Sequence, residues 1–134
     1  MIAADTSVVV AAFATWHEQH EPARVALDRG LRLVEHCALE TFSVLTRLPP
    51  PHRCSATVVR DFLRARFTAP FLRLDSAAYR EFLLSLPDHE VSGGAAYDAL
   101  VGATVAHCGA ELLTCDRRAA TIYDSYGVRA TFLS

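Results

Sequence analysis

The sequence predicts an α/β fold in which a mostly parallel sheet of five strands is covered by helices on both faces, a three-layer α/β/α arrangement. Short apolar runs, typical of buried strands, alternate with segments whose apolar residues recur at helical spacing. Strands separated by helices pair in parallel, because the chain must cross a face of the sheet between them. A length of 134 residues suits one such domain and is too short for two, so residues 1–134 are expected to form a single domain.

The expected strands are short apolar runs bounded by polar or turn residues. The first of them, from Ile2 to Asp5, stands at the start of the chain and leads directly into a helical segment. The expected strands span residues 2–5, 31–34, 71–74, 111–115 and 128–132.

The expected helices begin at capping residues and end at residues that stop a helix. Ser55 can accept a hydrogen bond from the first turn of the helix that follows it. Gly30 is a natural C-terminal stop, and Pro87 disfavours continuation. The expected helices span residues 6–14, 22–30, 37–47, 55–66, 75–86, 95–108 and 117–126.

The charge balance excludes a uniformly basic surface. The net charge is -2, so any binding of nucleic acid must be confined to one part of the surface. All 13 basic residues are arginine, whose planar guanidinium suits phosphate binding. A GC-rich coding bias is nevertheless the simpler explanation for the absence of lysine.

The apolar segments and the cysteines favour a cytoplasmic protein that does not associate with a membrane. No segment reaches the ~20 apolar residues of a membrane span, and the first residues lack the basic and apolar regions of a signal peptide. The four cysteines form no C-x-x-C pair and lie in or beside apolar segments, as reduced thiols do. We therefore expect no disulfides.

Four carboxylates stand where the expected fold would bring them together. Asp5 and Asp116 each end an apolar strand, and in an open α/β sheet chemistry collects at the carboxyl ends of strands. Glu40 and Asp98 lie on expected helices among apolar neighbours. Ionised carboxylates are costly to desolvate, and several of them together repel one another. A hard divalent cation with oxygen ligands is the simplest compensation, so these four residues are candidate metal ligands.

Each carboxylate also has a purely structural interpretation. Asp5 and Asp116 can cap the helices that follow them. Asp98 lies near the start of its helix, where the helix dipole favours a negative charge. Glu40 can form an ion pair with Arg47, two turns later. The joint pattern, with two acids at strand ends and two on helices that can pack beside those ends, favours a shared site.

The histidines and cysteines are poor candidates for a soft-metal site. The histidines of His17-Glu18-Gln19-His20 are three residues apart instead of the four of a zincin motif, and no apolar helix surrounds them. The members of His36-Cys37 and of His107-Cys108 are adjacent, so they point in different directions on a helix. We therefore expect no zinc site.

The acids and their neighbours resemble the PIN-domain ribonucleases, and the size and order of motifs resemble especially the VapC-type toxins of bacterial toxin–antitoxin pairs. The matching motifs are Asp5-Thr6-Ser7, Glu40 after a short strand, Asp98-Ala99-Leu100 in a helix of small residues, and Thr114-Cys115-Asp116 after a strand. The resemblance covers essentially the whole chain. Four motifs in this order are more specific than any one of them.

This resemblance implies a Mg²⁺- or Mn²⁺-dependent endoribonuclease. In the family the four acids form the metal site, and a sheet order of 3-2-1-4-5 would bring Asp5 beside Asp116. By the same resemblance, Ser7 and Thr114 would orient ligands or water. The implied partners are an RNA substrate, a cognate VapB-type antitoxin and a second copy of the chain in a homodimer.

Arg117 and Arg118 are the candidate substrate-binding residues. They follow Asp116 directly, where many relatives have a single basic residue, so the phosphate contacts are less certain than the metal site. Both could neutralise RNA phosphates near the acids, with Arg47 as a third candidate.

Other classes fit the acids less well. A receiver domain would need an acidic pair after its first strand and a lysine, which the chain lacks. A haloacid-dehalogenase-like phosphatase would need a second acid at the position of Ser7. A catalytically inactive PIN-like module that binds RNA or a protein is the remaining alternative, and metal titration with and without RNA would separate it from an enzyme.

Overall fold

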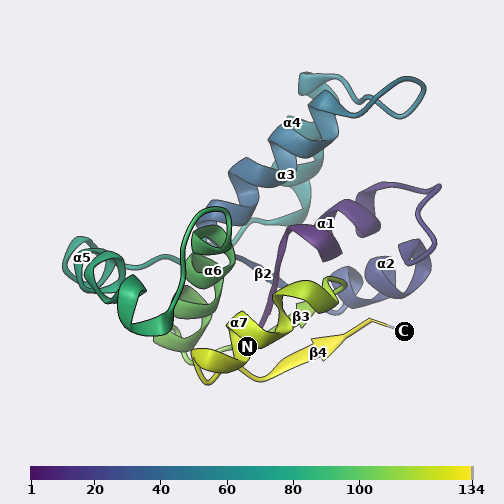
Figure 1. The fold of residues 1–134 in the computed structure, drawn as a ribbon. Helices are drawn as coiled ribbons and strands as arrows, with labels where there is room; N and C mark the ends of the chain where they lie inside the picture. Colours follow the sequence, from purple (N-terminus) through teal and green to yellow (C-terminus); the bar gives the residue numbers. More distant parts are fainter. Residues whose placement is uncertain (134) are drawn as a thin grey trace.

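The computed structural model describes residues 1–133 and has the predicted α/β architecture with a parallel sheet (Figure 1). The strands are β1 (Ile2–Ala4), β2 (Arg32–Leu33), β3 (Glu111–Thr114) and β4 (Ala130–Phe132). The α-helices are α1 (Thr6–Phe13), α2 (His20–Asp28), α3 (Glu35–Arg47), α4 (Ala56–Arg66), α5 (Ser76–Ser85), α6 (Ala95–His107) and α7 (Ala120–Ser125). The 3-10 helix η1 (Leu86–His89) follows α5, and a second, η2 (Arg117–Ala119), precedes α7.

The two strands that end in predicted acids are neighbours at the centre of the sheet. The strand order is β2-β1-β3-β4, and all neighbouring pairs are parallel. Ala4 is in register with Leu33 on one side and with Leu113 on the other. The backbone N–H of Asp5 continues this ladder by donating to the carbonyl of Leu113 at 3.3 Å. The side chain of Asp5 therefore emerges beside the end of β3.

The prediction of five strands is wrong for the part of the chain that the structure describes, where the sheet has four. The segment 71–74 makes a single parallel bridge, between Leu72 and Val34. Pro70 has no N–H to donate to a ladder, and Asp75 already caps α5. The residues between them are too few to extend the pairing. The bridge still places this segment beyond β2, where the predicted order put its third strand.

Several helix boundaries also differ from those predicted. α3 begins at Glu35, two residues early, and the expected helix 117–126 is divided into η2 and α7. Pro87, which was expected to end the helix 75–86, instead lies in the first turn of η1. The missing N–H of a proline at this position would be unpaired in any case. Within residues 1–133, no helix is both long enough and apolar enough to cross a membrane.

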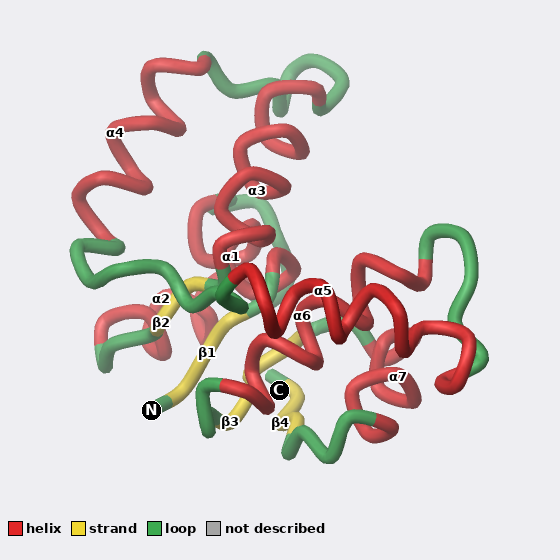
Figure 2. The backbone as a smooth tube through the Cα atoms, turned by 90° about the vertical axis from the view of Figure 1, so that its left-hand side faces the viewer, coloured by secondary structure: helices red, strands yellow, loops and turns green. Residues whose placement is uncertain are grey.

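Helices cover both faces of the sheet, while α3 and α4 together extend from it as an arm (Figures 1 and 2). The main core lies between the strands and helices α1, α3, α6 and α7. Its most completely buried large side chains are Val8, Val9, Leu33, Val34, Val105, Leu112 and Tyr123. A smaller cluster of Leu74, Phe82 and Ala99 attaches α5 to α6.

The small residues of α6 allow α7 to approach it closely, as their pattern predicts. A Cβ atom placed on Gly102 would lie 3.4 Å from Cδ2 of Tyr126 and 3.5 Å from Cδ1 of Tyr123. These are tight van der Waals contacts, so larger side chains at this position would push the two tyrosines away. The close packing matters for function because it sets the position of Tyr123 beneath the carboxyl end of β1.

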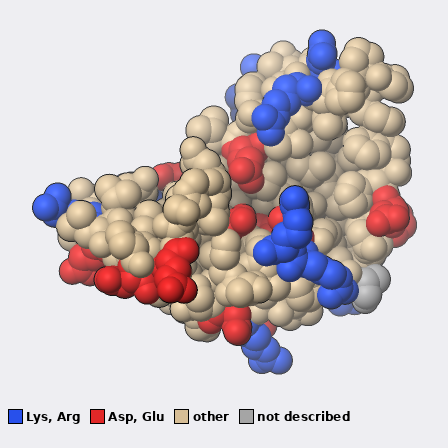
Figure 3. Space-filling model, in the orientation of Figure 1, with Lys and Arg blue, Asp and Glu red and all other residues tan. Residues whose placement is uncertain are grey.

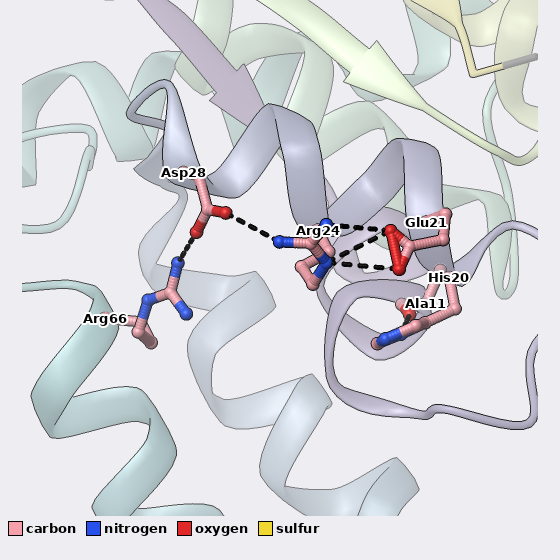
Figure 4. Close-up of polar contacts among 6 residues, drawn as sticks. All are labelled: Ala11, His20, Glu21, Arg24, Asp28 and Arg66. Carbon is pink, nitrogen blue, oxygen red and sulfur yellow. Dashed lines mark hydrogen bonds and ion pairs between the residues drawn. The ribbon is translucent and has the colours of Figure 1, made fainter.

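Figure 4 shows how α2 is joined to its neighbours. The Nδ1 atom of His20 lies 2.9 Å from the carbonyl oxygen of Ala11 in α1. Asp28 accepts hydrogen bonds from Arg24 at 2.9 Å and from Arg66 of α4 at 2.5 Å. These ion pairs are exposed, so each contributes only about 0–1 kcal/mol, and only the Arg66–Asp28 pair joins α4 to α2.

Candidate active site

The structure brings all four predicted acids to one small cavity at the carboxyl ends of β1 and β3. The cavity has a volume of about 50 Å³, and we call it the acidic cavity. Its acidic lining residues are Asp5, Glu40, Asp98 and Asp116. Figure 3 shows acidic atoms in the hollow at the centre of one face, with arginine atoms above and beside them.

Asp5 is the most buried of the four, with only 4% of its surface exposed. Three hydroxyl groups donate hydrogen bonds to its carboxylate. Ser7 donates to Oδ1 at 2.5 Å, while Thr114 and Tyr123 donate to Oδ2 at 2.5 and 2.9 Å. Asp5 is also the N-cap of α1, where it accepts the N–H of Val8 at 3.4 Å. Its side chain is therefore fixed by donors from three separate parts of the chain.

Ser7 and Thr114 connect the Asp5 carboxylate to the loop that carries Asp116. Ser7 Oγ accepts the backbone N–H of Cys115 at 2.8 Å, and Thr114 Oγ1 accepts that of Asp116 at 2.9 Å. Each hydroxyl thus donates to Asp5 and accepts from the end of β3. The two residues that the sequence proposed as supporting groups therefore lie directly between the two strand-end acids.

Tyr123 was not predicted from the sequence. It lies on α7, 118 residues from Asp5, and its hydroxyl is the third donor to that carboxylate. Burial and the nearby charge of Asp5 raise the pKa of Tyr123 far above its usual value, so the phenol stays protonated and remains a donor. No local motif marks this residue, because its partner is reached only through the packing of α7 on α6.

Burial is the main cause of a raised pKa at Asp5 itself. The hydrogen bonds from Ser7, Thr114 and Tyr123 oppose this effect without cancelling it. An ionised carboxylate in this position is destabilising unless a positive charge is bound nearby.

Asp98 lies in the first turn of α6 and is half-buried. Its pKa is raised by burial and then by the negative charges of Asp116, Glu40 and Asp5, in that order. The charge of Arg118 opposes the shift but is the weakest of these influences. The acidic cavity therefore has an excess of negative charge, and this charge adds to burial in raising the pKa of Asp98.

Glu40 has a partner that the sequence interpretation did not select. The sequence suggested Arg47 as its ion-pair partner, but His36 Nε2 lies 3.6 Å from Glu40 Oε2, one turn earlier on α3. The polar contact with His36 is the main cause that lowers the pKa of Glu40. The His36 ring in turn stacks on Tyr97, with ring centroids 5.2 Å apart and 10° between the planes. The i, i+4 spacing of His36 and Glu40 was the signal that could have revealed this pair.

Asp116 lines the acidic cavity, and the two arginines after it line a polar pocket that shares Asp116 and Ser7 with the cavity. Asp116 is the N-cap of η2 and accepts hydrogen bonds from the backbone N–H and from Nε of Arg118, at 3.0 and 3.3 Å. The Arg117 guanidinium lies over the ring of Phe132, 4.5 Å from its centroid. Arg117 is thus held on an aromatic face, while Arg118 is almost fully exposed and paired with Asp116.

The donor set of the acidic cavity fits a hard divalent cation. All four acids contribute oxygen atoms, the ligand type that Mg²⁺ and Mn²⁺ prefer, and the buried Asp5 lacks a cationic partner among its hydrogen bonds. Within residues 1–133, however, no group of three or more His, Cys, Asp or Glu side chains is arranged so that it could hold a metal ion as it stands. This open arrangement is compatible with Mg²⁺, which retains several of its waters when protein carboxylates bind it.

The hydroxyl of Tyr123 should contribute measurably to stability. Replacing Tyr123 with Phe removes one of the two donors to Asp5 Oδ2, which should lower the free energy of unfolding by about 1.5–3 kcal/mol. Urea unfolding in the presence of a chelator measures this change. Tyr126→Phe is the matched control, because the buried Tyr126 hydroxyl has no hydrogen-bond partner among residues 1–133 and its removal should not lower the free energy of unfolding. Equal losses in both variants would contradict the assigned role.

The charge of Asp98 should destabilise the metal-free protein at neutral pH. Because its pKa is raised in the folded state above the ordinary 3.8, the cost is absent below that pH and fully present above the folded pKa. Asp98→Asn should therefore raise the Tm at pH 7, with a gain that shrinks as the pH falls towards 4. Thermal unfolding measured between pH 7 and pH 4 tests this expectation. Asp124→Asn, on the exposed side of α7, is the control. A gain that is independent of pH, or a loss, would be inconsistent with charge repulsion.

Comparison with known proteins agrees with the resemblance seen in the sequence. The PIN domain family model matches residues 2–124. The chain is 51% identical over 134 residues to "Ribonuclease VapC40" of Mycobacterium tuberculosis, a match that covers all of both chains. It is 40% identical over 129 residues to "Ribonuclease VapC27" of the same species, covering 95% of this chain and 93% of the relative.

Solved structures show the same fold at low sequence identity. FitAcB from Neisseria gonorrhoeae superposes with a TM-score of 0.68 at 18% identity, covering 97% of this chain and 96% of that one. FitAB bound to an IR36 DNA fragment gives 0.70 at 17% identity, covering 98% and 94%. Together with the family model and the two full-length relatives, these matches show that the chain belongs to the PIN-domain family, in its VapC group.

Proposed function

We propose that this chain, acting as one domain, is a Mg²⁺- or Mn²⁺-dependent endoribonuclease that hydrolyses RNA phosphodiester bonds as the toxin of a toxin–antitoxin pair. The observation that carries the proposal is the convergence of four carboxylates on one cavity around the buried Asp5. The names of the two mycobacterial relatives, both ribonucleases, support the same activity.

The proposed metal ligands are the four acids of the cavity. When bound there, a divalent cation supplies activation of a water molecule and stabilisation of the leaving 3′-oxygen. Asp5 contributes a carboxylate whose orientation three hydroxyls already fix, so little freedom is lost when the ion binds. Ser7 and Thr114 keep Asp116 at a constant position relative to Asp5 through their backbone hydrogen bonds.

Arg117 and Arg118 are the proposed phosphate-binding residues. The guanidinium of Arg117 is held over Phe132, which reduces the freedom it must lose when it binds a phosphate. Arg118 is exposed and pairs with Asp116, so a bound cation that competes for Asp116 would leave Arg118 available for the substrate. Arg47 is also exposed, at the end of α3, and could contact a longer RNA.

The proposed inhibitor is a VapB-type antitoxin in the same cytoplasmic compartment as the RNA. A nuclease with an open acidic cavity would cut RNA continually unless a partner blocked it. A lysine or arginine of that partner can satisfy the desolvated carboxylates in place of the metal. The strong negative charge around Asp98 supports this mode of inhibition.

The alternative, an inactive PIN-like binding module, would not need a shared cavity for its acids. A buried and uncompensated Asp5 is a cost that a purely structural role does not explain. Titration with Mn²⁺, with and without RNA, discriminates the two, because the metal should turn on cleavage of the RNA by an enzyme, whereas an inactive module would leave the RNA intact at every metal concentration.

We also propose that the chain forms a homodimer through the outer face of α5. Large apolar side chains there are exposed: Tyr79 by 47%, Leu83 by 52% and Leu84 by 63%. The helix α4 offers less apolar surface, because Phe62 and Leu63 pack against the core and Val58 is its exposed large apolar residue. Burial of such a patch against a second copy would remove it from water.

The dimer is tested by mass in solution. Light scattering at micromolar concentration should give about twice the 14.7 kDa of one chain. Leu83→Glu should shift the mass to that of the monomer without lowering the Tm of the monomer, because Leu83 is already exposed there. A wild-type protein that stays monomeric at these concentrations would refute the proposal.

The ribonuclease activity is tested by sequencing the RNA ends produced on brief expression. The wild-type chain should generate new 5′ ends at defined positions, whereas Asp5→Asn and Asp98→Asn should generate none above background. Both variants should stay folded, because each removes a destabilising charge. The purified wild-type protein should lose its cleavage in a chelator and regain it with Mg²⁺ or Mn²⁺. Cleavage retained by both purified variants would rule out the acidic cavity as the active site.

A further inference from the structure

Two exposed aromatic rings, those of Trp16 and His52, lie against each other in a tilted arrangement, and the proposed function does not use them. Trp16 follows α1, and His52 lies in the loop between α3 and α4. Their ring centroids are 4.2 Å apart, with 32° between the planes. The His17 ring lies 6.0 Å from that of Trp16. We call these three rings the aromatic platform.

The rings of Trp16 and His52 are exposed, and backbone hydrogen bonds close the turns that carry the platform. Trp16 is 49% exposed, although it is the only tryptophan of the chain and one of its largest apolar side chains. Backbone hydrogen bonds hold both loops, from His17 to the Ala14 carbonyl and from His52 to the Pro49 carbonyl, each at 3.0 Å. His17 Nδ1 also accepts the N–H of Gln19 at 3.0 Å. A fixed aromatic face that stays in contact with water is suited to cover a planar ligand.

His17 connects the platform to the candidate active site, whereas Trp16 and His52 lie outside the lining of the pocket between them. This polar pocket, of about 470 Å³, adjoins the platform, and His17 lines it. The other side of the same pocket includes Ser7 and Asp116, which belong to the acidic cavity. Arg117 and Arg118 also line it. A ligand that crosses the pocket would pass from the aromatic rings, over two guanidinium groups, to the carboxylates.

We propose that the aromatic platform binds one unpaired nucleobase of the RNA substrate, with Trp16 as the main stacking residue. The arginines would bind the phosphates between this base and the scissile bond. This inference rests on the proposed ribonuclease function and adds a subsite to it.

Three physical arguments favour RNA as the occupant of the platform. Every base has a planar face that can stack on an aromatic ring, and such stacking contributes to single-strand binding in a sequence-tolerant way. The guanidinium groups of Arg117 and Arg118 complement phosphates. The polar lining of the adjoining pocket, which includes Glu18 and Gln19, is less suited to the apolar anchor of a protein segment. The platform should therefore select RNA whose bases are unstacked and exclude regular duplex.

The single tryptophan gives a direct readout of base contact without catalysis. In a chelator, where the metal-dependent reaction is off, a short single-stranded RNA oligonucleotide of mixed sequence should quench the Trp16 fluorescence in a saturable way. The same oligonucleotide with abasic sites has the same charge but no base to stack. It should bind about tenfold more weakly to the wild-type protein and quench little.

Variants at position 16 test whether the Trp16 ring causes the tighter binding of RNA that carries bases. Trp16→Ala should bind the intact oligonucleotide about tenfold more weakly, measured by anisotropy of a labelled RNA, and should no longer distinguish it from the abasic one. With metal present, its KM should rise while kcat changes little, because a contact remote from the scissile bond acts equally on bound substrate and transition state. Trp16→Phe should restore most of the affinity. Phe71→Ala is the matched control, since Phe71 is also exposed, by 41%, but lies beyond β2.

The outcomes separate this inference from the proposed function. If the wild type cleaves RNA and Trp16→Ala binds and cleaves as well as Phe71→Ala, the platform is not a base-binding subsite. If a peptide from the antitoxin, but not RNA, quenches Trp16, the platform is a protein contact and the inference is wrong. If the wild type cleaves no RNA under any metal condition, the proposed function itself fails. Circular dichroism melts of each variant exclude loss of fold as the cause.

Discussion

The structure depends on one physical constraint: an ionisable carboxylate, Asp5, is buried at the end of the central strand. Burial of a charge is unfavourable unless donors and counter-charges surround it. The fold supplies the donors through three hydroxyls, two of which also bind the backbone at the end of β3. The geometry of the acidic cavity is therefore a consequence of how the chain solvates this single group.

Among residues 1–133, no positively charged group donates a hydrogen bond to Asp5. Three further acids add negative charge around the same cavity, and burial together with this repulsion raises the pKa of Asp98. A protein that retains such an arrangement sacrifices stability in the metal-free state, which is typical of sites built for binding or catalysis. The family to which the chain belongs, and the arginines on the rim of the cavity, are consistent with an anionic substrate brought to a cation held by the acids.

The parts of the site that depend on short-range sequence pattern could be predicted from the sequence. Asp5 and Asp116 were recognisable because each ends an apolar run, and parallel strands place such ends at one edge. Tyr123 was out of reach, because its contact with Asp5 depends on the packing of α7 on α6 across 118 residues. His36 was within reach through its spacing from Glu40, but the charged Arg47 was the more obvious partner.

The fold divides in the same way into parts set by local sequence pattern and parts set by tertiary packing. The helices and most strands follow from periodicity and capping residues. The segment 71–74 has the composition of a strand, yet the length of its ladder is set by how far it runs alongside β2 before α5 begins, which is a tertiary property. The contact between Trp16 and His52 joins two separate loops and likewise has no local signature.

The central claim is that the acidic cavity is a divalent metal site organised by Asp5. A crystal soaked in Mn²⁺ and measured for anomalous scattering tests it most directly, because manganese is then located without reference to activity. We expect an anomalous peak in the cavity, coordinated by Asp5 together with other members of the acidic set, and no such peak in an Asp5→Asn crystal. Manganese bound only at surface carboxylates such as Asp28, with the cavity empty, would contradict it.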